Sequence, residues 1–283
     1  MNTSENPDFD ESILQLEMEL LLEALVRQYG YDFRNYNKAH IKRRLIFRMQ
    51  QLGLKSLSEL QHQILHHSNI LATILKDLSI NVTEMYRDPS FYLSLRNEVI
   101  PLLRTYPYLR IWHAGCATGE EVYSFAILLK EEGLYERSQI YATDFNTEVL
   151  ETAKKGIYPV SKIKEYTFNY QAAGGKNSFS DYYTARYDAV RFDPELRKNI
   201  VFANHNLVTD SVFAETHLII CRNVLIYFDR SLQNKVLNLF NDSLIMGGFL
   251  GLGSKENIMF STVQDHFLIL NPNEKIFQKK ILK

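Results

Sequence analysis

In residues 12–75, apolar positions recur at spacings of three and four residues, which is the period of an amphipathic α-helix. Gly30 and Gly53 interrupt this pattern, and Ser56 stands where a new helix would begin, ahead of Glu59. The region lacks the strict alternation that predicts a half-buried strand. The pattern therefore predicts a small all-helical module. Its apolar positions include Leu14, Leu21, Leu22, Leu25, Ile41, Leu45, Ile46, Met49 and Leu52.

From residue 109 onward, short β-type runs alternate with amphipathic helices. This alternation is typical of a mostly parallel sheet that is covered on both faces. Between about residues 158 and 199 the alternation lapses, and a tyrosine-rich stretch there is compatible with either a short antiparallel insert or a surface loop. The predicted strands are residues 110–114, 139–143, 200–203, 218–221 and 249–252, with helices that begin at Glu120, Asn146 and Ser231.

Charge and composition narrow the class of protein. The 283 residues include 32 Lys and Arg against 33 Asp and Glu, a net charge of −1, which excludes a generally basic nucleic-acid coat. The longest apolar run, residues 217–228, is too short to span a bilayer. The first 23 residues hold acidic side chains and no Lys or Arg, unlike a secretory leader, so a cytoplasmic location is expected. In that compartment Cys116 and Cys221 are expected to be small packing residues and not a disulfide.

Residues 111–121 predict a strand that runs through a glycine turn into a helix, and ligands of α/β sheets bind at such turns. The turn is not a dinucleotide motif, because Ala117 takes the place of the second glycine. Glu120 and Glu121 open the helix, where they would repel a pyrophosphate and attract a cation. NAD is therefore disfavoured. The alternative is that the two carboxylates only complement the helix dipole.

Two further strand ends carry candidate chemistry. Asp144 follows the second predicted strand, where a nucleotide-type fold places the acid that accepts hydrogen bonds from ribose, although it could instead cap the next helix. Arg222 and Asn223 interrupt an apolar run, and a buried charge needs partners to offset its desolvation. The pair indicates a function, and the alternative is a buried arginine that is bonded to backbone carbonyls.

Five segments carry a family resemblance. Residues 81–88 resemble N-x-T-x-F-F-R-D, residues 115–124 resemble G-C-S-T-G-E-E-P-Y-S, and residues 142–144 resemble A-T/S-D. Residues 222–229 resemble R-N-V-M-I-Y-F-D, and residues 254–257 resemble a S-E-N turn. In this order they are similar to the motifs of the CheR-type chemotaxis-receptor glutamate methyltransferases, which depend on S-adenosylmethionine. The resemblance extends over about residues 14–280.

The resemblance implies a Rossmann-like class I methyltransferase domain of α/β fold at residues 79–283, with a short antiparallel β insert at about 158–199. It implies a small N-terminal all-helical domain at residues 12–78 that recognises the receptor. The expected activity transfers a methyl group from S-adenosylmethionine to glutamate carboxylates of a chemoreceptor cytoplasmic domain, leaving S-adenosylhomocysteine. The expected partners are the receptor's helices, with recruitment to membrane receptor arrays but no membrane insertion, no nucleic acid and no metal. A monomer is the default expectation.

The resemblance also implies site residues. Arg87 and Tyr227 are expected beside the transferring methyl group, as orienting groups and not as proton carriers. Met85, Tyr86, Ala117, Val122 and Gly253 depart from the family's usual residues, and most of these departures affect packing. The implied cofactor contacts are Asn81, Thr83, Arg87, Gly115, Glu120, Glu121, Asp144, Asn206, Leu207, Arg222 and Asn223.

A basic segment suggests a partner surface. Residues 27–55 hold eight Lys and Arg against Asp32 alone, a net charge of +7. A basic helix face is predicted there, and in the resembled family this helix meets the acidic helices of the receptor. The alternatives are a solvated surface and a nucleic-acid site, and the latter is disfavoured because the segment lacks an interleaved aromatic platform of the kind that single-stranded binding favours. The receptor-binding candidates are Lys38, Lys42, Arg43, Arg44 and Arg48.

The chemistry implied for the site needs neither a base nor a metal. A glutamate with a pKa near 4.3 is already ionised at neutral pH, so alignment is the main task of the protein. Two other readings remain open. One is a non-catalytic module that senses S-adenosylmethionine in a signalling pathway. The other is a nucleic-acid methyltransferase, which would normally show an N/D-P-P-Y/F signature that this sequence lacks.

Overall fold

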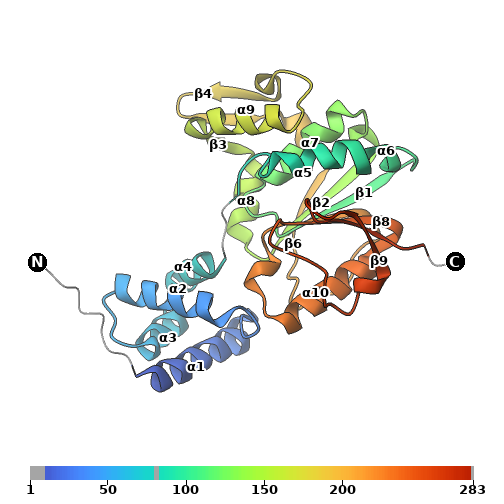
Figure 1. Cartoon of the computed structure of the whole chain (residues 1–283). Coiled ribbons are helices and arrows are strands. Elements are labelled where there is room, and N and C mark those ends of the chain that lie inside the picture. Colours follow the sequence, from blue (N-terminus) through green and yellow to red (C-terminus); the bar gives the residue numbers. More distant parts are fainter. Residues whose placement is uncertain (1–9, 80–82, 282–283) are drawn as a thin grey trace, which may run out of the picture. The chain divides into compact units, whose positions relative to one another are not determined.

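The computed structural model describes residues 10–79 and 83–281. The chain forms two compact units (Figure 1). Of the described residues, the first comprises 10–79 with 227–232, and the second comprises 83–226 and 233–281.

The first unit is helical, as the apolar spacing predicts. It contains α1 (Glu11–Tyr29), α2 (Lys38–Gln51), α3 (Leu57–His66) and α4 (Ser68–Leu78). Local signals fix the ends of these helices. The side chains of Asp10, Asn37 and Ser56 accept hydrogen bonds from backbone N–H groups of the first turns of α1, α2 and α3. Gly30 ends α1 in the left-handed region at φ 78°.

The buried faces of these helices carry most of the apolar residues that the sequence pattern selects. They form one core in which α1 packs on α3, while α4 packs on α2 and α3. Two of the selected positions lie outside it, because Ile46 is half-buried and Leu52 is exposed. The buried side chains are Leu14, Met18, Leu21, Leu22 and Leu25 of α1, Ile41, Leu45 and Met49 of α2, Leu57, Leu60 and Ile64 of α3, and Ile74 and Leu78 of α4.

The second unit is built on a seven-stranded sheet with the order β6-β2-β1-β7-β8-β10-β9. The five strands from β6 to β8 are parallel, and β10 is antiparallel to both of its neighbours. The central strands are buried on both faces, which explains their nearly continuous apolar sequences. The strands are β1 (Leu109–Ala114), β2 (Ser138–Asp144), β6 (Ile200–Asn204), β7 (Thr216–Cys221), β8 (Leu244–Leu252), β9 (Phe267–Asn271) and β10 (Ile276–Lys279).

Helices cover both faces of this sheet. Figure 1 shows α5 (Pro89–Ser94), α6 (Ile100–Leu103) and α7 (Glu120–Glu131) on one face and α10 (Arg230–Ser243) on the other. A π-helical stretch, Leu95–Val99, joins α5 to α6. α8 (Thr147–Lys155) connects β2 toward the insert and contacts β2 and β6.

The tyrosine-rich region is an antiparallel insert. Its sheet has the order β3-β5-β4, with β3 (Ile157–Pro159), β4 (Tyr183–Arg186) and β5 (Ala189–Phe192). It also holds a helix that the sequence pattern does not predict, α9 (Ile163–Ala172). The buried side of α9 is formed by Tyr166 and Tyr170, so the segment lacks the aliphatic periodicity that indicates a helix.

The fold class expected from the sequence is therefore confirmed: a small helical domain, a Rossmann-like class I methyltransferase sheet and a short antiparallel sheet. Cys116 and Cys221 are both buried as free thiols, and burial raises their pKa values well above the ordinary range. Within residues 10–79 and 83–281, no helix is long and apolar enough to span a bilayer.

Candidate functional site

The candidate site lies where the parallel strands end. From β1 the chain winds outward through β2 to β6 on one side, and β7 and β8 continue the sheet on the other side. A sheet that reverses its winding in this way leaves a crevice at the carboxyl ends of its central strands. The loops after β1, β2, β6 and β7 carry most of the predicted site residues to this edge of the sheet.

The glycine turn after β1 packs tightly between two neighbouring segments. The backbone N–H groups of Gly115 and Cys116 both donate to the carbonyl oxygen of Thr143, at 2.8 and 2.9 Å. Gly115 has φ 76°, and a Cβ atom there would lie 2.5 Å from Cγ2 of Val224. Glycine is therefore required at this position both by its conformation and by the close approach of the segment after β7.

The carboxylate of Asp144 accepts hydrogen bonds from the backbone of this turn and of the turn after β2. Its Oδ2 accepts from the N–H of Ala117 at 3.0 Å, and its Oδ1 accepts from the N–H of Asn146 at 2.9 Å. The side chain is buried, and burial raises the pKa of Asp144 above its ordinary value although the backbone donors oppose this shift. The N-cap of α8 is Asn146, so the alternative that Asp144 caps this helix is wrong.

Arg222 is buried among acidic and aromatic groups. Its guanidinium donates to a carboxylate oxygen of Asp88 at 2.5 Å and to the carbonyl oxygen of Arg87 at 3.0 Å. A carboxylate oxygen of Glu121 lies 3.4 Å away, and the guanidinium carbon lies 4.2 Å above the ring of Phe91. Two carboxylates and one carbonyl therefore hold this arginine. The alternative, an arginine bonded only to backbone carbonyls, does not describe these contacts.

Glu121 links Arg222 to the sheet. Its second oxygen lies 3.1 Å from Nδ1 of His113, a side chain of β1 that is fully buried. Burial by itself raises the pKa of Glu121, but His113 and Arg222 outweigh it and leave the pKa below its ordinary value. The formal charges of the two carboxylates of Asp88 and Glu121 and of the Arg222 guanidinium sum to −1. Sequence reasoning missed His113, although a polar residue inside an apolar strand is the signal that identified Arg222.

Glu120 has a different set of partners. Its Oε2 accepts a hydrogen bond from the hydroxyl of Thr118 at 2.6 Å, and Tyr166 of the insert also interacts with it. Burial raises the pKa of Glu120 to about 7. The two glutamates at the start of α7 thus have opposite pKa shifts, because Glu121 interacts with Arg222 and His113 and Glu120 is mainly desolvated.

Glu256 holds the segment after β7 in place. Its carboxylate accepts from the N–H groups of Asn223 at 2.9 Å, Val224 at 2.8 Å and Gly253 at 2.6 Å, and from Ile226 at 3.3 Å. The side chain is only 4% exposed, and burial raises its pKa despite these donors. The resemblance places Glu256 in the S-E-N turn, but its role as an acceptor for this segment was not predicted.

Backbone strain concentrates at the same edge. Among the described residues, seven that are not glycine have a positive φ. Ala117 at 47° and Asn223 at 61° lie in the loops after β1 and β7, and Tyr86 at 52° and Asp88 at 56° lie in the segment before α5 that contacts Arg222. Such conformations cost about 1–3 kcal/mol each and gather at functional sites.

The structure gives fewer contacts for the remaining residues that were predicted to bind the cofactor. Asn81 lies outside the described residues. Thr83 and Arg87 are half-buried ahead of α5, and Arg87 lowers the pKa of Glu84 electrostatically, although burial leaves that pKa raised overall. After β6, Asn206 accepts from the N–H of Val208 at 3.0 Å, and Leu207 is buried.

Tyr227 belongs to the first unit, in which its carbonyl oxygen accepts from the N–H of Asn37 at 2.7 Å. Its ring lies 5.9 Å from that of His40. Arg87 belongs to the second unit. The joint role predicted for Arg87 and Tyr227 therefore stays a prediction.

The candidate receptor-binding residues of α2 differ in their surroundings. Lys38 lies 3.7 Å from Glu19, Lys42 pairs with Glu11, and Arg48 lies 2.6 Å from Asp77. Arg44 is partly buried and donates to the carbonyl oxygen of Asp77. Arg43 is exposed, and no ion pair is recorded for it among the residues that the structure describes. Much of the +7 charge of this segment is thus compensated by neighbouring acids.

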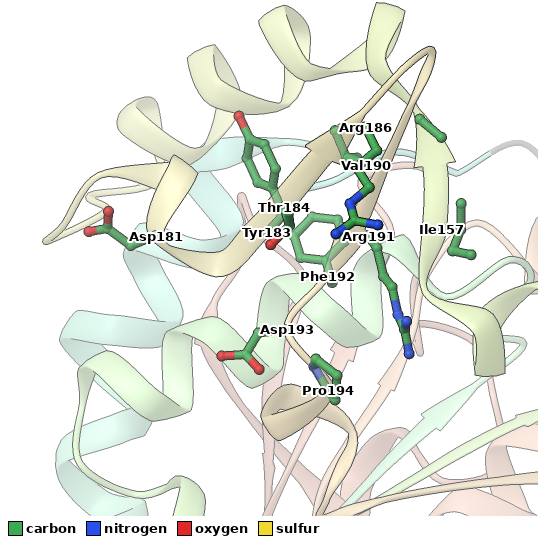
Figure 2. A pocket seen from close by; sticks show the side chains of 11 residues that line it. Ile157, Asp181, Tyr183, Thr184, Arg186, Val190, Arg191, Phe192, Asp193 and Pro194 are labelled. Atoms are coloured by element: carbon green, nitrogen blue, oxygen red, sulfur yellow. The ribbon is translucent and has the colours of Figure 1, made fainter.

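A separate pocket of about 510 Å³ lies on the insert. Figure 2 shows side chains of both charges at its wall, including Arg186 and Arg191 on one side and Asp181 and Asp193 on the other. Its lining belongs to the insert and the turn after it, and includes none of the loops after β1, β2, β6 or β7. Within the described parts of the chain, no group of three or more His, Cys, Asp or Glu side chains is arranged to hold a metal ion.

Family comparisons agree with the geometry. Residues 81–276 match the family described as "CheR methyltransferase, SAM binding domain", and residues 16–79 match "CheR methyltransferase, all-alpha domain". Cher3 of Pseudomonas putida, which is provisionally named a methyltransferase, is 52% identical over 93% of this chain and 97% of its own length. The chemotaxis protein methyltransferase of Listeria innocua is 30% identical over 89% and 92%, and that of Escherichia coli is 28% identical over 87% and 85%.

Solved structures show a more distant likeness. PKMT2 from Rickettsia typhi in complex with AdoHcy is 16% identical, with a TM-score of 0.33, over 52% of this chain and 21% of that chain. Magnesium protoporphyrin IX methyltransferase from Synechocystis, with bound SAH, is 14% identical, with a TM-score of 0.32, over 59% and 58%. The chain thus spans less than two thirds of the length of either solved protein.

Proposed function

Because this chain belongs to the CheR family of S-adenosylmethionine-dependent methyltransferases, we propose that it methylates glutamate side chains in the cytoplasmic helices of a chemoreceptor. The product would be a glutamate methyl ester, and S-adenosylhomocysteine would remain. The relatives named as chemotaxis methyltransferases support the choice of receptor, and the structure supports the choice of cofactor.

The observation that carries the proposal is the excess negative charge at the carboxyl ends of β1 and β7. Asp88 and Glu121 share one buried cation, Arg222, and no phosphate could be seated beside them without repulsion. A ligand that brings an ammonium and a sulfonium group suits such a site. Asp144 adds a buried carboxylate at the end of β2, where a ribose would be bound. The residues present therefore fit S-adenosylmethionine.

Each residue would then have a distinct task. Glu121, kept ionised by His113 and Arg222, would face the ligand's amino group, and Asp144 would accept from the ribose hydroxyls. Gly115 lets the backbone approach the ligand closely. Asn206 and Leu207 would border the adenine, and Asn223 is held toward the site by Glu256.

The bound cofactor supplies an activated methyl group on a positively charged sulfur. The incoming glutamate is ionised at neutral pH, so no side chain of this protein has to remove a proton. What the protein contributes is alignment of the carboxylate and exclusion of water, which can lower the barrier by several kcal/mol. We assign Arg87 and Tyr227 to this orienting role, with Arg87 pairing with the substrate carboxylate.

The helical unit would supply recognition of the receptor. Because Lys42, Arg44 and Arg48 already contact acidic partners or a carbonyl within the unit, Arg43 is the basic side chain of α2 most available to an acidic helix. Charge of this kind mainly accelerates association and selects the partner. The compensated charge of the segment also disfavours the nucleic-acid alternative.

The direct experiment incubates the protein with methyl-labelled S-adenosylmethionine and the cytoplasmic fragment of a chemoreceptor. We expect label on glutamate that alkali releases as methanol, and no label with the Asp144→Asn variant at low cofactor concentration. An alkali-stable product would contradict glutamate as the substrate. Cofactor binding without transfer to any receptor fragment would favour the alternative of a non-catalytic sensing module.

A further inference from the structure

The loop after β8 exposes two adjacent apolar side chains. Met259 is 50% exposed and Phe260 is 82% exposed. Phe260 also has φ 63°, a left-handed conformation that is unfavourable for a residue with a large side chain. An exposed aromatic residue on a strained backbone does not stabilise the folded chain by itself. Its position therefore points to a role in binding.

Hydrogen bonds and buried neighbours hold the loop on both sides of Met259 and Phe260, which form its tip. The N–H of Phe260 donates to the side chain of Gln264 at 2.7 Å, and the N–H of Met259 donates to the side chain of Asn257 at 3.2 Å. Ile258 and Val263 are buried on either side of the tip. The two apolar side chains therefore stay exposed because their neighbours are anchored, and not because the loop lacks structure.

Helix α10 adds two further anchors. The side chain of Asn234 accepts from the N–H of Thr262 at 3.1 Å, and that of Asn238 donates to the hydroxyl of Thr262 at 2.7 Å. In this way the position of the tip is fixed relative to the sheet that α10 covers.

The tip belongs to the same edge of the sheet as the proposed active site. β8 runs parallel to β7, so its following loop also leaves from the carboxyl end. Phe260 lies four residues after Glu256, whose carboxylate binds the backbone of Asn223, Val224 and Ile226. One loop thus carries both Glu256, which holds the segment after β7, and, three and four residues later, the exposed Met259 and Phe260.

We propose that Met259 and Phe260 form a docking contact for the protein substrate, on the apolar surface of the helix that carries the methylated glutamate. This inference rests on the proposed function. A glutamate on a helix can reach the site only if the adjoining surface of that helix contacts the loops around the site. Apolar residues three and four positions from the glutamate would then contact Met259 and Phe260. Two side chains bury far less than the roughly 800 Å² per partner of a stable dimer, so a second copy is not the occupant.

The experiment compares steady-state methylation of a receptor fragment by the wild type, by Phe260→Asn and by Met259→Ser/Phe260→Asn. Asparagine tolerates a positive φ, so the fold should survive its introduction. We expect KM for the fragment to rise about five- to thirtyfold for removal of one large apolar contact, with the cofactor Kd unchanged. Tyr108→Asn is the matched control, because Tyr108 is a 46% exposed aromatic residue that directly precedes β1 and so lies at the amino end of the sheet.

A wild-type KM in both tip variants, or an equal rise in Tyr108→Asn, would overturn the contact. Fluorescence anisotropy of the labelled receptor fragment measures its binding to the protein. This measurement distinguishes failure of the docking contact from failure of the proposed methyltransferase activity. If the wild type binds the fragment without methylating it, and the tip variants bind more weakly, the contact holds and the activity does not. If the wild type neither binds nor methylates, both are wrong. The wild type could also bind anionic lipid vesicles, with this binding lost in the tip variants. That result would overturn the proposal, because the partner of Met259 and Phe260 would then be a membrane surface and not the protein substrate.

Discussion

The guanidinium group of Arg222 lies 2.5 Å from a carboxylate oxygen of Asp88, although the two residues are 134 positions apart in the chain. The contact ties the segment before α5 to the end of β7. The same guanidinium contacts Glu121 at the start of α7, so three segments of the proposed cofactor site share one buried cation. Removing it would leave two carboxylates without their common partner.

Replacing this cation should therefore destabilise the second unit. For Arg222→Met, which keeps most of the volume, we expect the free energy of unfolding to fall by about 3 kcal/mol, because Glu121 loses its charged partner in a buried position. Urea denaturation followed by tryptophan fluorescence measures the change. Lys154→Met is the control, since the exposed pair of Lys154 with Glu151 should contribute well under about 1 kcal/mol. Equal losses in the two variants would contradict the role of Arg222.

Glu120 should make stability depend on pH. Its pKa is about 7 in the folded chain against an ordinary 4.5, so the folded state binds more protons between these values. The contribution of Glu120 to stability is then fully present below pH 4.5 and is lost as the pH rises through about 7. Glu120→Gln should lose this dependence, so the variant gains stability relative to the wild type from pH 5 to pH 8, by up to about 3 kcal/mol. Thermal unfolding across this pH range measures the difference, and parallel curves for the two proteins would show that Glu120 is not desolvated.

Glu256 should be needed for the segment after β7. A glutamine has one acceptor oxygen in place of two, so Glu256→Gln would leave some of the four backbone N–H groups without a partner. We expect a loss of about 2 kcal/mol in stability. Hydrogen exchange at Asn223, Val224 and Ile226 should become faster, whereas exchange in the insert strands serves as an internal reference. Unchanged protection at these three amides would mean that the segment is held by other contacts.

Reversing charge on α2 should weaken association with the receptor. In Lys42→Glu/Arg43→Glu, one change removes an exposed cation and the other places a like charge beside Glu11. We expect weaker binding of a receptor fragment at low ionic strength, with the difference from the wild type shrinking as salt is added. The cofactor Kd should be unchanged. Lys154→Glu on α8 provides a charge reversal outside the helical unit. Loss of cofactor binding in the α2 variant would mean that recognition and cofactor binding are assigned to the wrong domains.

Much of the architecture could be predicted because the parallel strands are buried on both faces. Their apolar runs stand out between amphipathic helices, and the order of motifs along the chain identifies the family. β9 and β10 were not predicted. They form a short antiparallel pair at the edge of the sheet, with five and four residues, and no predicted amphipathic helix separates them from each other or from β8. The alternation of strands and helices that indicated the parallel strands is therefore missing there. α9 was missed because tyrosines form its buried side.

The candidate site residues could be selected from the sequence one by one, but the contacts among them could not be predicted. An Arg-Asn pair in an apolar run identified Arg222, yet nothing in the sequence indicates that its partner is Asp88 and not Glu84. The same holds for Glu256, because its four donors lie 3 to 33 positions away and are backbone groups, which any residue supplies. Long-range pairing of this kind depends on sheet order, which the local pattern does not contain.

Isothermal titration calorimetry with S-adenosylmethionine, S-adenosylhomocysteine and NAD tests the central claim most directly. We predict that both sulfur compounds bind with one site per chain, that Asp144→Asn weakens both by tenfold or more, about 1.4 kcal/mol, and that NAD gives no heat of binding. Asp188→Asn, at the exposed hairpin of the insert, should bind as the wild type does. If neither sulfur compound binds, or if NAD binds and displaces them, the acidic edge of the sheet is not the cofactor site.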